Sequence, residues 1–182
     1  MRLKILTYPD PILKKKSGPV KKADRSLQEL VENMFETMYN APGVGLAAPQ
    51  VGILQRILVV DVGRLEGETH KSDPKVLINP VIKTREDKII WEEGCLSLPN
   101  LIVPVERSKK IIVEGWDRSG KTVKYLAEDL LAVAFQHEID HLDGILLTNR
   151  LSQLKRELYL KKLKKHEASE PVEHGSGPVY MG

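Results

Sequence analysis

The segment 126–142 constrains the fold of this chain more than any other part of the sequence. Apolar residues recur in it at helical spacing, and the run QHEIDH at 136–141 follows them directly. Gly144 stands just past the end, where a glycine commonly stops a helix. Because unpaired polar groups are costly in a core, a buried helix must give such side chains partners or a task. The sequence therefore predicts one helix over 126–142 that carries a polar cluster inward.

Two further helices and several strands are expected around that segment. Apolar residues at spacings of three and four predict a helix over 24–39, with Asp24 as its N-cap. A C-terminal helix is expected over 152–166, with Leu154, Leu158 and Leu163 packed on the domain and basic residues in solvent. An arm lying on the core is expected at 1–20, and a loop of small residues at 43–50. Strands are predicted at 56–61, 76–79, 88–91, 109–116 and 121–125, the last two as a hairpin.

This order of elements indicates an α+β fold. The strands come without an alternating strand–helix–strand rhythm, which favours mostly antiparallel pairing around the central helix. A chain of 182 residues is long enough for one well-buried core. We therefore expect a catalytic domain at 1–166 and a flexible tail at 167–182, a segment with prolines, glycines and little to bury.

Composition limits where the chain works. Its sole cysteine, Cys95, excludes an intramolecular disulfide and favours a reducing compartment. No run approaches the ~18 consecutive apolar residues of a membrane span, and the first residues lack the apolar stretch of a signal peptide. The net charge of +3 is too small to indicate nucleic acid by itself. These features predict a cytoplasmic protein without a membrane segment.

The two histidines of the QHEIDH run suit a metal ion. His137 and His141 are four residues apart, which places both imidazoles on one helix face about one turn apart. The carboxylate of Glu138 can reach a water activated by the metal and act as general base. The competing interpretation is a solvated polar helix segment. The apolar residues before it favour a buried metal site and metal-assisted hydrolysis.

A catalytic metal site of this kind needs a third protein ligand and an open position. The downstream candidates, a histidine at 166 and glutamates at 157 and 167, fit neither common spacing for a metalloprotease. Upstream, Cys95 follows Gly94, whose lack of a side chain lets the backbone approach closely. We take Cys95 as the third ligand; a buried inert cysteine, a zincin-like endopeptidase and a closed structural metal site remain as alternatives.

Three motifs together resemble the peptide deformylase family. They are GVGLAAPQ at 43–50, EGCLS at 93–97 and QHEIDH at 136–141, in the order in which the family has them. The resemblance covers roughly residues 1–165 and includes the YPDP segment at 8–11. The segment after His166 does not match the family pattern. Such a resemblance implies removal of the formyl group from the N-terminal formylmethionine of newly made polypeptides, with release of formate.

The resemblance also implies roles for individual residues. Cys95, His137 and His141 would bind one divalent metal, with ferrous iron favoured over zinc, nickel or cobalt. Water activated by that metal would attack the formyl carbon. Glu138 would take its proton and later deliver it to the leaving amine. The side chain of Gln50 and the backbone N–H of Leu96 would stabilise the oxyanion.

Further residues are expected to hold the substrate. The resemblance implies that Val44 and Gly45 line the cleft, with the Gly45 backbone pairing with the peptide as an added strand. Leu130, Val133 and Ala134 precede His137 by one to two turns and would form an apolar pocket for the methionine side chain. Plain helix core is an equally good interpretation of each of these three residues taken singly.

Two expectations concern the surroundings of the site. Arg107 and Asp140 are expected to pair and orient the ligand helix, because metal-bound histidines usually need hydrogen bonds behind them. Glu93 is interpreted as a rim charge or a solvated loop residue.

The basic helix at 152–166 has two interpretations. It solvates its lysines, or, as the family implies, it docks on the ribosome by attraction to ribosomal RNA. The sequence leaves open the oligomeric state, the residues preferred after formylmethionine, and a bacterial or organellar origin.

Overall fold

The computed structural model describes residues 1–64, 72–166 and 181, and its architecture is α+β as predicted. One sheet of five strands has the order β1-β2-β3-β4-β5, and every neighbouring pair is antiparallel. The strands are β1 (Gly45–Ala47), β2 (Ile57–Val60), β3 (Lys75–Cys95), β4 (Leu98–Trp116) and β5 (Thr122–Glu128). The α-helices are α1 (Arg25–Tyr39), α2 (Asp129–Leu142) and α3 (Gln153–His166). Short 3-10 helices are η1 (Pro11–Lys14), η2 (Ala48–Val51), η3 (Val62–Arg64) and η4 (Leu147–Arg150).

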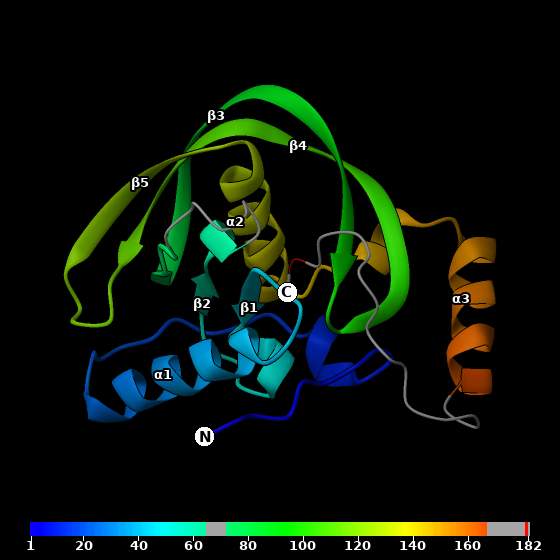
Figure 1. Ribbon diagram of the computed structural model, residues 1–182, viewed down its shortest axis with the longest axis horizontal. Coiled ribbons are helices and arrows are strands. Elements are labelled where there is room, and N and C mark those ends of the chain that lie inside the picture. The colour runs from blue at the N-terminus through cyan, green and yellow to red at the C-terminus, as the bar shows by residue number, and fades with distance from the viewer. Residues whose placement is uncertain (65–71, 167–180, 182) are drawn as a thin grey trace.

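The short strands β1 and β2 lie between two helices. Helix α1 contacts one face of them and α2 contacts the other, as Figure 1 shows. The four residues of β2 are therefore all buried: Leu58 and Val60 join the core on the α2 side, whereas Ile57 and Val59 join the core on the α1 side. Side chains alternate along a strand, so a continuous apolar run fits a strand with both faces covered.

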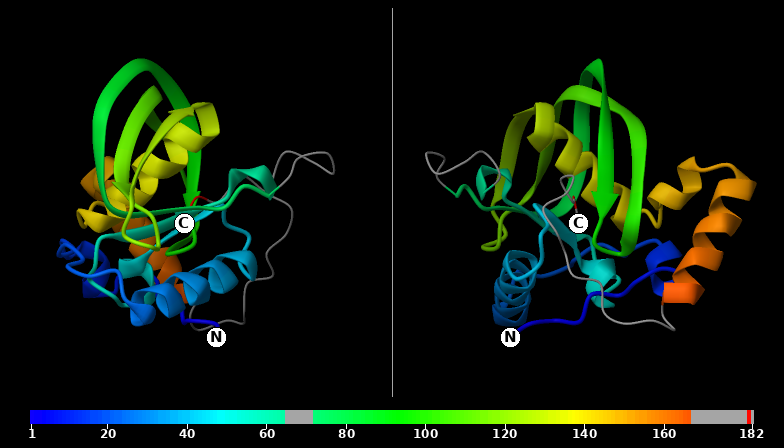
Figure 2. Two further views of the ribbon diagram at one scale, coloured as in Figure 1. Left: turned by 90° about the vertical axis from the view of Figure 1, so that its left-hand side faces the viewer. Right: turned by 45° about the vertical axis from the view of Figure 1, so that its right-hand side comes forward.

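The long strands β3 and β4 form a hairpin that arches over α2 (Figures 1 and 2). The hairpin closes at Cys95, which pairs with Leu98. Separate strands were predicted at 76–79 and 88–91, but both belong to the single strand β3. The polar residues between them are mostly exposed, and their backbone pairs with β4 apart from two irregularities before Val81 and Thr84, so pairing rather than composition extends the strand.

Helix α2 is buried along nearly its whole length. Residues 132–138 are consecutively buried, because the sheet encloses the helix on several sides. The predicted start at 126 was wrong, since β5 continues to Glu128 by pairing with β4. The predicted loop at 43–50 was also wrong in part, because it contains β1 and most of η2. Helix α1 agrees with its prediction, and Asp24 caps it by accepting a hydrogen bond from the N–H of Leu27 at 3.1 Å.

The N-terminal arm ties together the segments that carry the motifs. The N–H of Leu6 donates to the carbonyl of Gln50 at 2.7 Å, and the N–H of Tyr8 donates to that of Ser97 at 2.8 Å. Further along, the N–H of Ser17 donates to the carbonyl of Leu142 at the end of α2, also at 2.8 Å. The arm therefore fixes the two motif loops relative to the helix. This agrees with the predicted arm on the core.

Helix α3 packs on the domain by a different face from the one predicted. Tyr159 is buried, stacks on Tyr8 with ring centroids 6.2 Å apart, and has Leu160 and Leu163 partly buried beside it. Leu154 and Leu158 are 67% and 49% exposed, so the prediction that they pack on the domain was wrong. At about 100° per residue, Leu154 lies opposite Leu163, and Leu158 lies beside the buried face rather than on it.

Most of the predicted tail at 167–182 lies outside the described residues. Met181 is the exception, and it is buried in the core between α2 and β1. Within the described parts of the chain, no helix combines the length and the apolar character needed to cross a membrane.

Candidate functional site

Three potential metal ligands from two elements converge inside the domain. Cys95 ends β3, while His137 and His141 lie on successive turns of α2, and all three side chains are buried. Their ligand atoms lie within 4.8 Å of one another. Because β3 and β4 arch over α2, a cysteine more than forty residues upstream reaches the histidine pair.

The spacing of these atoms fits a coordinated cation. Cys95 Sγ lies 3.2 Å from His141 Nε2, which in turn lies 3.2 Å from His137 Nε2. Tetrahedral bonds of about 2.0–2.3 Å to nitrogen and sulfur separate the ligand atoms by roughly 3.3–3.6 Å. The ligand set, one sulfur and two imidazole nitrogens, also matches a catalytic site with three protein ligands and a fourth position open.

The surroundings of Cys95 favour a cation as its partner. Burial raises the pKa of its thiol well above the usual value, and the charge of Glu138 raises it further. The backbone amides of Ser97 and Leu98 donate to the sulfur and act in the opposite direction. A coordinating cation reverses this balance, because a thiol bound to such a metal is deprotonated.

Glu138 lies beside this cluster without a partner for its carboxylate. The residue is fully buried, and neither carboxylate oxygen has a hydrogen-bond partner among the described residues. Burial raises the pKa of Glu138 well above its usual value, and the nearby charge of Glu93 adds to the effect. A carboxyl group with a raised pKa holds a proton more readily than an exposed one, as a general acid and base requires.

Gly45 has no side chain, and the carboxylate of Glu138 occupies the space that a side chain would take. A Cβ added at Gly45 would lie only 2.3 Å from Glu138 Oε1. Strand β1 therefore approaches α2 more closely than any residue with a side chain would allow. The predicted substrate-binding strand and the predicted general base are in direct contact.

Gln50 is buried and its carboxamide is oriented. The N–H of Ala47 donates to Gln50 Oε1 at 2.8 Å, which turns Nε2 toward the cysteine: Nε2 lies 3.1 Å from Ser97 Oγ and 3.8 Å from Cys95 Sγ. Leu96 lies in the tight connection between β3 and β4, directly after Cys95. Both predicted oxyanion donors are therefore placed next to the cluster.

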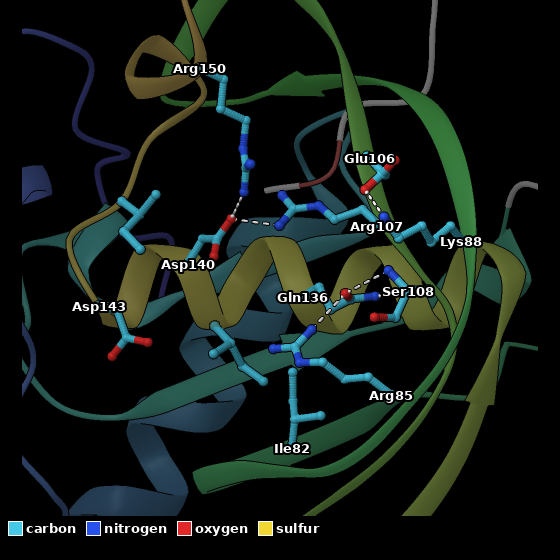
Figure 3. Close-up of a pocket in the computed structure, with 12 residues that line it drawn as sticks. Ile82, Arg85, Lys88, Glu106, Arg107, Ser108, Gln136, Asp140, Asp143 and Arg150 are labelled. Atoms are coloured by element: carbon cyan, nitrogen blue, oxygen red, sulfur yellow. Dashed lines mark hydrogen bonds and ion pairs between the residues drawn. The ribbon is translucent and has the colours of Figure 1, made fainter.

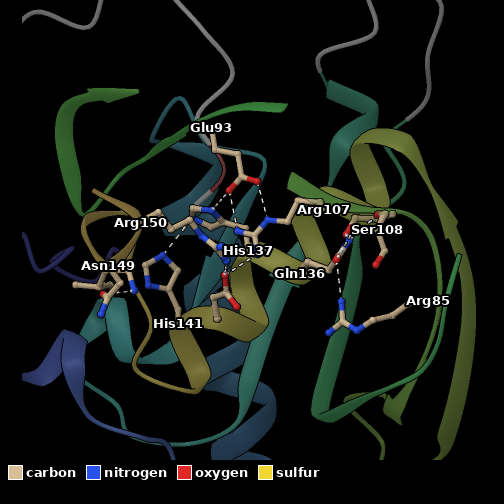
Figure 4. Close-up of polar contacts among 12 residues, drawn as sticks. Arg85, Glu93, Arg107, Ser108, Gln136, His137, His141, Asn149 and Arg150 are labelled. Carbon is tan, nitrogen blue, oxygen red and sulfur yellow. Dashed lines mark hydrogen bonds and ion pairs between the residues drawn. The ribbon is translucent and has the colours of Figure 1, made fainter. Parts of the chain in front are cut away.

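An ion-pair network holds His137 from behind (Figure 4). Glu93 Oε2 lies 2.9 Å from His137 Nδ1, and Arg107 donates to both carboxylate oxygens of Glu93 at 2.7 and 2.9 Å. Burial alone would raise the pKa of Glu93, but hydrogen bonds from Arg107 and His137 hold that pKa at about 2. The carboxylate thus stays ionised and fixes the His137 ring so that Nε2 faces the other ligands.

The same arginine reaches Asp140, one turn along α2. Arg107 Nη1 lies 2.6 Å from Asp140 Oδ2, the contact that the sequence led us to expect. Arg150 also donates to this oxygen, at 2.9 Å. Figure 3 shows Arg107 and Arg150 converging on Asp140 at the edge of a pocket that α2 lines together with β3 and β4.

Glu93 is the residue that the sequence interpretation missed. It was taken as a rim charge or a solvated loop residue, whereas the structure buries it completely against Arg107 and His137. A signal was present: Glu93 is two residues before Cys95 on a strand, and alternate residues of a strand share a face. Arg150 had no comparable signal, because it reaches Asp140 from η4 through the fold.

The residues predicted to hold the substrate surround one apolar region. Val44, Val133 and Ala134 belong to a single buried cluster, and Leu130 is partly buried against it. Gly45 begins β1 at the edge of this cluster, next to Glu138. The structure therefore gathers Val44, Leu130, Val133 and Ala134 in one apolar cluster, with Gly45 between this cluster and Glu138.

Comparison with known proteins identifies the family of this chain. The model of the polypeptide deformylase family matches residues 2–157 of the chain. The chain belongs to this family. A peptide deformylase of Thermodesulfovibrio yellowstonii is 52% identical over 162 residues, which are 89% of this chain and 96% of that relative. The family resemblance inferred from the three motifs is thereby confirmed.

Solved structures agree with the fold as well. A peptide deformylase from Legionella pneumophila is 42% identical, with a TM-score of 0.84 over 94% of this chain and 100% of that one. A peptide deformylase from Ehrlichia chaffeensis in complex with actinonin is 40% identical, with a TM-score of 0.85 over 92% of this chain and 99% of that one. The arched hairpin around α2 is therefore a shared architecture.

Proposed function

We propose that this deformylase removes the formyl group from N-formylmethionyl peptides with one divalent cation held by Cys95, His137 and His141. The observation that carries the proposal is the convergence of these three ligand atoms beside Glu138, a buried carboxylate to which no described residue donates a hydrogen bond. When bound, the cation supplies a Lewis acid that polarises the formyl carbonyl and acidifies water. Such a site suits hydrolysis of a small acyl group.

The protein's own side chains divide the remaining work. Glu138 takes a proton from the attacking water and delivers it to the amine that leaves, a role that its buried position beside the ligands supports. Gln50 Nε2 and the Leu96 N–H stabilise the negative charge that develops on the formyl oxygen. Glu93, Arg107 and Asp140 position the ligand helix and do not touch the substrate.

The peptide binds along β1 in this proposal. Val44 and Gly45 offer backbone groups to an extended chain, as an added strand requires. The methionine side chain enters the apolar region formed by Leu130, Val133 and Ala134. Residues 1–166 make up the catalytic domain.

The decisive assay uses anaerobically purified protein and formyl-Met-Ala-Ser, with release of formate as the readout. We expect formate from the wild type, full metal occupancy without turnover in Glu138→Ala, and reduced metal occupancy in Cys95→Ser. A wild type that binds metal and releases no formate overturns the proposal.

Ferrous iron is the proposed metal, and the cytoplasm is the proposed location. Sulfur and imidazole ligands accept iron, zinc, nickel and cobalt alike. A ferrous thiolate centre is open to oxidation of the sulfur, so Cys95 requires a reducing compartment. Elemental analysis of protein purified without air identifies the metal, and zinc alone under those conditions would contradict the iron assignment.

We also propose that α3 docks on the ribosome through its outward side. That side carries the exposed residues Leu154 and Leu158 among lysines, which suits contact with ribosomal RNA and protein. Replacing Lys161, Lys162, Lys164 and Lys165 by glutamate should weaken ribosome binding and leave turnover of a short formyl peptide intact. Unchanged ribosome binding removes the idea.

A further inference from the structure

Met181 is held by the strand-forming edges of the candidate substrate site. Its carbonyl oxygen accepts hydrogen bonds from the N–H groups of Val44 and Gly45, both at 3.1 Å. Its own N–H donates to the carbonyl of Gly94 at 3.0 Å. One methionine from the far end of the chain therefore uses the backbone groups of two motifs, GVGLAAPQ and EGCLS.

Met181 is enclosed by its surroundings, as a residue of a bound peptide would be. It has no exposed surface, and it belongs to the same buried cluster as Val44, Val133 and Ala134. Its carbonyl oxygen would lie 2.9 Å from a Cβ added at Gly43, so the glycine leaves room for this close approach. The region predicted to receive the methionine of a substrate thus contains a methionine of the chain itself.

The two flanking segments connect Met181 directly to the reactive groups. Gly94 immediately precedes Cys95, and Gly45 is in contact with Glu138. In the proposed function an extended peptide uses the backbone of Val44 and Gly45, and Met181 bonds to the same two N–H groups. Met181 donates one backbone hydrogen bond to Gly94 and accepts two from the consecutive N–H groups of Val44 and Gly45, so its backbone bridges the two segments.

We propose that Met181 acts as a pseudosubstrate, which occupies the peptide site and competes with formylmethionyl peptides. This inference rests on the proposed function of the site. The fourteen residues 167–180 join α3 to Met181, and a chain of that length can span up to roughly 45 Å when extended. A link of this length allows Met181 to compete with a formylmethionyl peptide for the site of its own molecule.

Competition of this kind has a kinetic signature that a packing role lacks. A site that is open for only a fraction of the time binds its ligand more weakly by that fraction. Removing the occupant therefore lowers KM and leaves kcat unchanged. A residue that only fills the core would, when removed, lower stability and kcat together.

The test compares the holoenzyme of the full chain with three variants: a truncation after Glu167, the full-length Met181→Asp, and the full-length Met181→Leu as matched control. We expect KM for formyl-Met-Ala-Ser to fall about fivefold or more in the truncation and in Met181→Asp, with kcat unchanged. Met181→Leu keeps an apolar side chain and the backbone contacts, so its KM should stay near that of the wild type. The peptide Gly-Pro-Val-Tyr-Met-Gly, added in trans, should inhibit the truncated enzyme competitively.

A second readout does not depend on turnover. Hydrogen exchange of the Val44 and Gly45 amides should be faster in the truncation than in the full chain, because Met181 accepts from both. Equal KM values and equal exchange in the full and truncated chains overturn the pseudosubstrate. Absence of formate release from every variant overturns the proposed function instead, and equal exchange in the full and truncated chains would still overturn the inference.

Discussion

The two sides of helix α2 differ in how completely their polar groups are paired. On the side of β3 and β4, Gln136 exchanges hydrogen bonds with Arg85 and Ser108, and Asp140 accepts from two arginines. On the metal-facing side, both carboxylate oxygens of Glu138 and the Nδ1 of His141 have no partner among the described residues. One side holds the helix in place, and the other carries the polar atoms to which we assign the chemistry.

Two glutamates show the consequence of this difference. Burial acts on both, but Arg107 and His137 hold the pKa of Glu93 at about 2, whereas the pKa of Glu138 is raised well above its usual value. The first is a fixed negative charge, and the second is the proton carrier of the proposed mechanism. Buried polar groups without hydrogen-bond partners lower the free energy of unfolding. The hydrogen bonds and ion pairs on the paired side must therefore offset the loss on the reactive side.

The largest effect is expected on the reactive side, from Glu138→Gln. Loss of the proton carrier should lower kcat/KM by roughly 10²- to 10⁴-fold. The free energy of unfolding of the metal-free protein should not fall, because the variant removes a buried carboxylate that lacks a partner. Formate release and urea denaturation measure the two quantities. A loss of stability comparable to the loss of activity would contradict the division between the two sides.

On the paired side, Arg107→Met should mainly destabilise the protein. The change leaves the buried Glu93 without its arginine, whereas Asp140 keeps Arg150, and breaking a buried pair typically costs about 3–5 kcal/mol. Metal affinity should fall by roughly 10- to 100-fold, because His137 loses its orientation. Denaturant unfolding and metal titration measure both effects.

The double variant Arg107→Met with Glu93→Gln provides the control for that prediction. It removes the uncompensated carboxylate, so part of the lost stability should return. If the double variant is as unstable as the sum of the single ones, the charge on Glu93 is not the cause.

Gly45→Ala tests the contact between β1 and the reactive side. The added methyl group has no room beside Glu138 Oε1, so the carboxylate must move. A displacement near 1 Å lowers activity by on the order of 100-fold. Gly18→Ala is the matched control, since the nearest atom to a Cβ there is 3.9 Å away. Equal activity of both variants would show that the position of Glu138 is not critical.

The smallest effect is expected for Asp140→Asn, on the paired side. The amide keeps an acceptor for Arg107 and Arg150 but loses the charge, which should cost about 1 kcal/mol of stability. Turnover should change less than twofold. A large loss of turnover, measured with saturating metal, would place Asp140 in the chemistry rather than behind it.

The sequence was most informative where one element carries the whole signal. The spacing of His137 and His141 predicted a metal pair on a helix, and the Asp24 cap predicted the start of α1 within one residue. The sequence was less informative where pairing between distant strands determines the bounds of an element. Pairing with β4 joins the segments 76–79 and 88–91 into the single strand β3. Pairing with β4 also extends β5 to Glu128.

By itself, then, the sequence determined the residue types of the metal site, because ligand chemistry and helical spacing are local properties. Only the tertiary structure decided the partners of those residues. The burial of Glu93 against His137, the arginines on Asp140 and the packing of Met181 on β1 all join segments far apart in the chain. Such contacts follow from the path of the β3–β4 hairpin over α2, and no local pattern encodes that path.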